Sequence, residues 1–209
     1  MNLRRWGRGS LILGLSGFAL AGGGGPPGPL TRDAALRGLP GVTVTEAPTG
    51  DFGPDSPRWM AGAGYVYAVR VQVGTRAERV LLTPSAAENS STVNNVLAYV
   101  GTVTPTASQR QALVTVARGF LTACAPDLAP QAQSIWAGLA RHDWAGTLGW
   151  QDRQLGPVRV GWSGRGGLNV AGREVAGLRA EWPGRSGRCV FEAVPSPGGE
   201  PQPPITLRP

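Results

Sequence analysis

The chain has 209 residues and a formal net charge of +7, and all 20 of its basic residues are arginine. This length suits a single domain. Three arginines precede residue 22, so the rest of the chain carries a net charge of only +4. One histidine, two distant cysteines and unclustered carboxylates do not make a conventional zinc site, so we expect neither a metal nor a cofactor.

Residues 1–21 have the three parts of a secretory signal peptide. A basic start is followed by the apolar run 11–21, which ends in the small-residue pattern Ala19-Leu20-Ala21. A membrane-spanning helix needs about 20 apolar residues, and this run is about half that length. We therefore predict cleavage after Ala21, no transmembrane segment after cleavage, and an extracytoplasmic protein that is periplasmic, envelope-associated or secreted.

Proline and glycine mark both ends of the remaining chain. Residues 22–30 form a Gly/Pro-rich spacer, and residues 195–209 contain many prolines and few apolar side chains. Segments of this composition stay extended and unpacked. We therefore predict a single domain over residues 31–194, followed by a Pro-rich disordered tail over 195–209.

The first part of the domain has the pattern of strands. Residues 64–73 alternate strictly between two faces and are rich in valine and tyrosine, as expected for a half-buried strand. Gly74 begins a turn into residues 78–83, which continue the alternation, so the two segments predict a hairpin. Residues 41–46 predict an earlier strand.

The middle of the domain has the pattern of helices. Apolar residues at helical spacing predict a helix over residues 91–101, with Gly101 at its end. Thr106 and Gln109 form a capping box at the start of a second helix, which reaches Cys124. A third helix is predicted over residues 127–141.

After residue 143 the pattern returns to strands. Short apolar runs at 147–150, 157–162, 178–182 and 189–194 alternate with glycine-rich turns, which is typical of an antiparallel meander. Strands, then helices, then strands indicate an α+β fold. We predict a mostly antiparallel sheet, built from N-terminal strands and a C-terminal meander, packed against about three central helices.

The two cysteines, Cys124 and Cys189, both follow the predicted signal peptide. In an oxidising compartment such a pair forms a disulfide. The bridge would join the second helix to the last strand. We predict a structural role, because no CxxC spacing indicates thiol exchange.

Arginine and tryptophan gather in the second half of the domain, where eight arginines lie between Arg141 and Arg188 and five of the seven tryptophans follow residue 135. The simplest interpretation is that the tryptophans build the core and the arginines coat its surface. The alternative is a surface that binds an anionic polymer or a glycan by stacking and charge. The candidate binding residues are Trp150, Arg153, Arg159, Trp162, Arg165 and Arg179.

No catalytic residue is predicted, and export favours a cell-envelope polymer or an envelope protein as partner over nucleic acid. The main alternative is an extracytoplasmic hydrolase that uses His142, the only histidine. The segment Gly161-Trp162-Ser163-Gly164-Arg165 begins like a nucleophile elbow, but arginine replaces its second glycine. A third hypothesis is a subunit of an envelope assembly that only docks a partner.

Overall fold

A computed structural model of the chain describes residues 29–47, 66–86, 92–170 and 172–191. The predicted signal peptide (1–21) and the predicted tail (195–209) lie outside these residues, as does most of the predicted spacer. No helix in the described ranges has the length and apolar character needed to cross a membrane.

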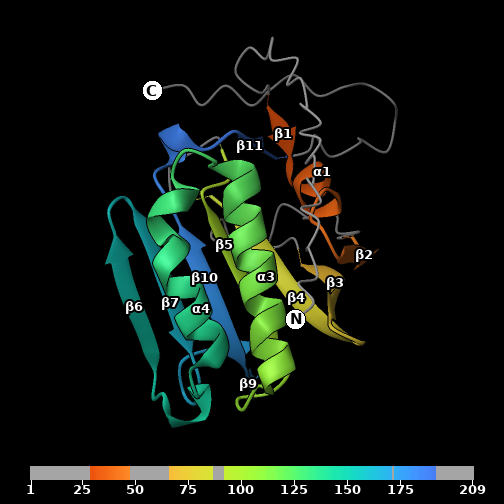
Figure 1. Ribbon diagram of the computed structural model, residues 1–209, viewed down its shortest axis with the longest axis vertical. Coiled ribbons are helices and arrows are strands. Elements are labelled where there is room, and N and C mark those ends of the chain that lie inside the picture. The colour runs from red at the N-terminus through yellow and green to blue at the C-terminus, as the bar shows by residue number, and fades with distance from the viewer. Residues whose placement is uncertain (1–28, 48–65, 87–91, 171, 192–209) are drawn as a thin grey trace, which may run out of the picture.

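A seven-stranded antiparallel sheet organises the domain (Figure 1). Its spatial order is β2-β3-β4-β5-β10-β7-β6. In that order the strands are Val42–Glu46, Tyr67–Val73, Arg76–Ser85, Asn95–Val100, Ala176–Glu181, Val158–Ser163 and Trp150–Leu155. The N-terminal strands and the C-terminal meander meet where β5 pairs with β10. The predicted α+β class is confirmed.

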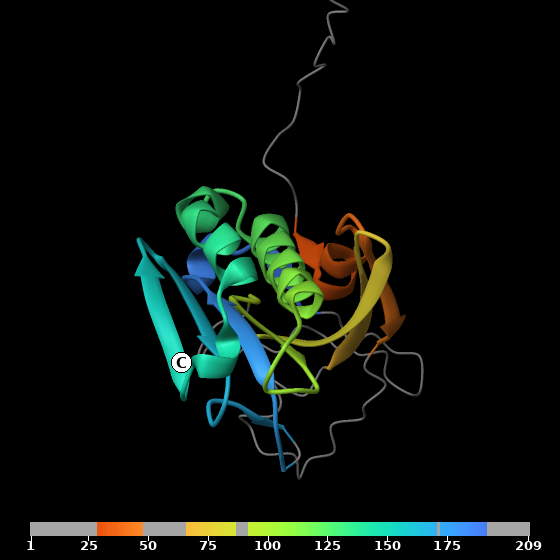
Figure 2. The same ribbon diagram turned by 60° about the horizontal axis from the view of Figure 1, so that its bottom comes forward.

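Three helices pack with the sheet. The helices α3 (Ala107–Cys124) and α4 (Gln133–Arg141) lie on the same face, and α1 (Arg32–Arg37) lies beside α3 near β2 (Figures 1 and 2). A 3-10 turn at Ala129–Ala132 leads into α4. The core lies between this helical layer and the sheet, where the buried residues include Val69, Leu82, Val96, Phe120 and Leu178.

The start of α3 follows from its capping box. Gln109 N donates to Thr106 Oγ1 at 3.2 Å, and Thr106 N donates to Gln109 Oε1 at 3.0 Å. Each residue thereby satisfies a backbone amide that has no partner inside the helix. The predicted start at Thr106 and end at Cys124 are confirmed.

The helix predicted over residues 91–101 is wrong, because this segment contains the central strand β5. Val96, Ala98 and Val100 face the helices, while Tyr99 on the opposite face is only 4% exposed. A strand buried on both faces is apolar at nearly every position, so it also matches a helical spacing. Gly101 ends a strand here instead of a helix.

Two further boundaries differ from the prediction. The strand expected at 147–150 is β6, which begins at Trp150 and continues through polar residues to Leu155. The last predicted strand, 189–194, is described as β11 (Cys189–Val190), which pairs in parallel with β1 (Leu30–Thr31) outside the main sheet. A small hairpin, β8 (Asn169–Val170) with β9 (Arg173–Glu174), lies between β7 and β10.

The predicted disulfide between Cys124 and Cys189 is confirmed. Their Cα atoms are 4.9 Å apart and both residues are fully buried. Arg188, next to Cys189, donates its backbone N–H to Cys124 O at 2.8 Å and its side-chain Nε to Ala123 O at 2.6 Å. The bridge and these bonds join the end of α3 to β11, and through β11 to β1.

Candidate functional site

The register of three neighbouring strands gathers part of the predicted binding set. Asp152 of β6 lies opposite Gly161 of β7, and Gly161 lies opposite Arg179 of β10. Opposing residues in a sheet share a face, and every second residue along a strand returns to it. Trp150, Asp152, Arg159 and Arg179 therefore lie together on the face opposite the helices; we call them the Asp152 cluster.

Asp152 is the centre of this cluster. Its Oδ1 accepts hydrogen bonds from Trp150 Nε1 at 2.9 Å and from Arg179 at 3.0 Å. Its Oδ2 accepts from Arg159 at 3.0 Å. One carboxylate thus fixes an indole ring and two guanidinium groups through charge-assisted hydrogen bonds.

Gly161 provides the space for this arrangement. A Cβ atom at Gly161 would collide with the Asp152 carboxylate and with the Nε1 edge of the Trp150 ring. The ring and the carboxylate therefore lie directly over the β7 backbone. The site depends on a glycine at the middle of a strand, where glycine otherwise weakens a sheet.

The electrostatics of Asp152 reflect two opposing effects. Burial raises the pKa of Asp152, but the hydrogen bonds from Trp150 and Arg179 and the charges of the arginines outweigh it and hold the pKa below its ordinary value. The carboxylate is therefore ionised at neutral pH and acts as an acceptor only.

The Asp152 cluster and the neighbouring Glu181 are together balanced in charge. Arg159 and Arg179 both pair with Asp152, and a Glu181 carboxylate oxygen lies 4.0 Å from Arg179 Nε. Two cations face two anions. This surface therefore offers hydrogen-bond donors and acceptors side by side without a net positive field.

A cavity of about 340 Å³ adjoins the cluster. It is lined by Arg159 and Glu181 together with Gln154, Asn94, Trp182 and two prolines. Gln154, Arg159 and Glu181 lie opposite one another on β6, β7 and β10, in the register row next to Asp152. The cavity therefore extends the same polar surface towards one end of these strands.

The other three predicted binding residues lie elsewhere. Arg153 and Trp162 point to the helix face of the sheet, because each is one residue out of phase with the cluster. Arg165 lies beyond the end of β7, where its backbone pairs with the segment 147–149. The structure thus places Trp150, Arg159 and Arg179 together and separates Arg153, Trp162 and Arg165 from them.

The tryptophans divide between core and surface. Trp136, Trp144 and Trp182 are buried, as in the simpler interpretation of the sequence, whereas Trp150 and Trp162 are only partly buried. Asp152 and Glu181 were not among the predicted site residues. Alternation along β6 would have placed Asp152 beside Trp150, had the strand been extended past residue 150.

His142 is exposed at the end of α4. Its Nε2 lies 3.4 Å from Thr147 Oγ1, and its ring lies edge-on to Trp162 with the centroids 6.2 Å apart. Ser163 belongs to strand β7 and is fully buried, without the exposed strand-to-helix turn of a nucleophile elbow. Ser163 is therefore not placed as an exposed nucleophile.

None of the protein-family models, curated proteins or solved structures compared with the chain matches it. Among the residues that the structure describes, no group of three or more His, Cys, Asp or Glu side chains could hold a metal ion.

Proposed function

We propose that the chain is an extracytoplasmic, non-catalytic binding protein that holds a glycan of the cell envelope at the Asp152 cluster. The observation that carries this proposal is the convergence of a partly buried indole ring, one carboxylate and two guanidinium groups beside a polar cavity. The buried disulfide supports a location outside the reducing cytoplasm.

A glycan matches this surface better than an anionic polymer does. Sugar hydroxyls both donate and accept hydrogen bonds, so they can use the Asp152 oxygens and the arginine N–H groups together. The apolar face of a sugar ring can pack on the Trp150 indole, which is large and carries a polar edge. An anionic polymer needs a positive field, and Asp152 together with the neighbouring Glu181 cancels the charges of Arg159 and Arg179.

The test is retention of the exported, disulfide-bonded protein on insoluble chitin and on purified peptidoglycan sacculi, from low to high salt. We expect binding that persists at high salt and is lost in Trp150→Ala. Arg153→Ala is the matched control, because it changes the same strand on the opposite face. Binding that fades as salt rises would instead indicate a polyanion, because salt screens exposed charges.

Two results would overturn the proposal: no retention on either glycan at any salt, or equal loss in Trp150→Ala and Arg153→Ala. Release of soluble sugar by the wild type, but not by His142→Ala, would replace the binding function with hydrolysis.

A further inference from the structure

Strand β4 extends beyond the strand that pairs with it. It pairs with β3 from Leu82 to Arg76, but with β5 only from residue 81 to residue 85. β5 ends at Val100, and the chain then turns towards β10, where Ala176 N donates to Thr102 O at 2.7 Å. Residues 76–79, which we call the β4 edge, therefore have no neighbouring strand on this side in the part of the chain that the structure describes.

The hairpin geometry shows which backbone groups face this side. A two-residue turn with Gly74 at φ +58° joins β3 to β4, so Val73 and Arg76 form its closing hydrogen-bonded pair. Every second residue of β4, starting at Arg76, then hydrogen-bonds to β3. The backbone N–H and C=O groups of the residues between them point away from β3. Ala77 and Arg79 consequently direct their N–H and C=O groups outward, as an exposed sheet edge does.

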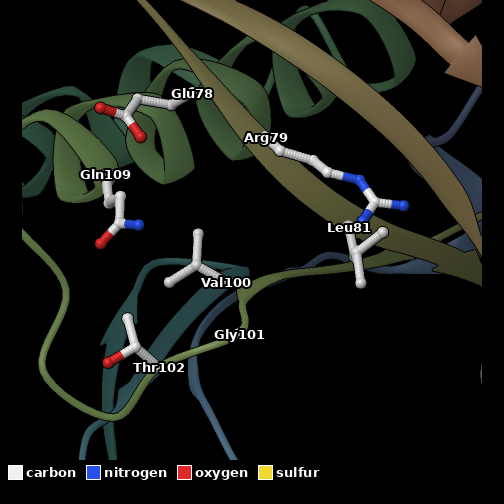
Figure 3. A pocket seen from close by; sticks show the side chains of 7 residues that line it. All are labelled: Glu78, Arg79, Leu81, Val100, Gly101, Thr102 and Gln109. Carbon is white, nitrogen blue, oxygen red and sulfur yellow. The ribbon is translucent and has the colours of Figure 1, made fainter.

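A cavity of about 390 Å³ lies along the β4 edge (Figure 3). Leu81 and Val100 supply its apolar part, and Glu78, Gln109 and Thr102 supply polar groups. Figure 3 shows Glu78 and Arg79 pointing to opposite sides of the strand, as alternation requires. Glu78 therefore lies on the helix side, near the start of α3.

We propose that the β4 edge pairs with the β4 edge of a second copy of this chain, in an antiparallel register centred on Ala77. In that register Glu78 lies opposite the partner's Arg76, and Arg76 lies opposite the partner's Glu78. Both pairs join opposite charges, and opposite charges at directly opposed positions stabilise the pairing of two strands. The cavity beside Glu78 then receives the partner's Arg76.

The neighbouring registers are unfavourable. Two identical strands related by a two-fold axis must centre on one residue. Centring on Glu78 opposes two carboxylates, and centring on Arg76 opposes two guanidinium groups. Centring on Arg79 places the partner where β5 already pairs with Leu81. Only the register at Ala77 combines opposite charges with an unoccupied position.

Small residues lie on the two-fold axis and at the turn of the proposed dimer. Ala77 opposes the partner's Ala77, and the partner's hairpin turn, which begins at Gly74, reaches Gly101 of this chain. Among the residues that the structure describes, nothing lies within 4 Å of a Cβ atom placed at Gly74 or at Gly101. Arg79 keeps its exposed contact with Glu46 at 3.3 Å, since it lies on the other face of the strand. The contact area is that of one hairpin, so we expect a weak dimer.

The test is sedimentation velocity of the exported, disulfide-bonded protein over a concentration series. We expect a monomer–dimer equilibrium. Glu78→Arg alone and Arg76→Glu alone each oppose like charges twice in the dimer, so each weakens dimerisation about tenfold. The double variant Arg76→Glu/Glu78→Arg restores both opposite-charge pairs and with them the dimer. Arg153→Glu, on the distant strand β6, is the control that leaves the dimer unchanged.

Thermal unfolding of each variant is the control for folding, because a variant that keeps the wild-type transition has lost only the dimer contact. A wild type that stays monomeric at every concentration would overturn the proposal. So would a dimer that survives both single variants, since it would use another surface, or a double variant as weak as the single ones.

Discussion

The guanidinium carbon of Arg179 lies 5.0 Å from the centroid of the Trp150 ring, although β10 and β6 are separated by β7. The Arg179 side chain can cross β7 because Gly161, the β7 residue that lies between Arg179 and Asp152, has no side chain. The same guanidinium also binds Asp152 at 3.0 Å. A cation–π contact and an ion pair thus hold the indole ring in one orientation, which is the preorganisation that a binding surface requires.

The first prediction concerns the charge of Asp152. We expect Asp152→Asn to lower the free energy of unfolding by about 1 kcal/mol at neutral pH, because partly exposed ion pairs contribute modestly. Since folding lowers the pKa of Asp152, its contribution is present above the unfolded pKa of about 4 and is lost as pH falls through the folded pKa. The difference between the two proteins should therefore shrink in acid.

Urea unfolding at neutral pH and at a series of acid pH values measures this difference. Glu46→Gln is a suitable control, because its pair with Arg79 is more than 60% exposed on both sides and should contribute little. If the free energies of unfolding of wild type and Asp152→Asn differed by the same amount from neutral to strongly acid pH, the ionised Asp152 carboxylate would not be the source of the stability.

The second prediction concerns Gly161. We expect Gly161→Ala to displace Trp150 and Asp152 and to lower the free energy of unfolding by about 1–3 kcal/mol, as overpacking does. Tryptophan fluorescence should change with it, and glycan retention should fall. Gly138→Ala is the matched control: its Cβ meets nothing within 4 Å inside α4, so it should be neutral or stabilising. Unchanged tryptophan fluorescence in Gly161→Ala would argue against the close approach of the Trp150 ring to the backbone at Gly161.

The sequence predicted elements well wherever local signals agreed with tertiary context. Strict alternation located β3, and the capping box located both ends of α3. The sequence of the central strand β5 predicts a helix instead, because a strand buried on both faces lacks the alternation of polar and apolar residues. The short helix α1 was missed, although Thr31 caps it and accepts from Ala34 N at 3.2 Å.

The sequence indicates the region of the candidate site but not which of its side chains lie together. The composition indicated the Arg/Trp-rich half, but grouping side chains needs strand register, which depends on long-range pairing. Edge strand β6 is polar from Gln151 to Gln154, so the apolar pattern ends at Trp150 and does not place Asp152 in a strand. Arg153 and Asp152 are neighbours in the sequence, but their side chains point to opposite faces of the sheet.

The third prediction concerns the disulfide. Its two cysteines are 65 residues apart in the sequence, and closing a loop of this length stabilises a protein by about 4 kcal/mol in the chain-entropy model. We expect Cys124→Ala/Cys189→Ala to lose about that much in guanidinium unfolding. Adding reductant should destabilise the wild type but leave the double variant unchanged. Equal midpoints for the oxidised wild type and the variant would show that the bridge contributes nothing.

The fourth prediction concerns the capping box of α3, the helix that spans most of the core. We expect Thr106→Ala to lower the free energy of unfolding by about 1 kcal/mol, because Gln109 N loses the acceptor at 3.2 Å that satisfies it. Thr122→Ala is the matched control: its hydroxyl donates to Arg118 O within the helix, and alanine has the higher helix propensity, so stability should be unchanged or slightly higher. Urea unfolding of both variants separates the two effects. If both lost the same stability, the cost would come from removing any threonine in α3, and the cap would have no special role.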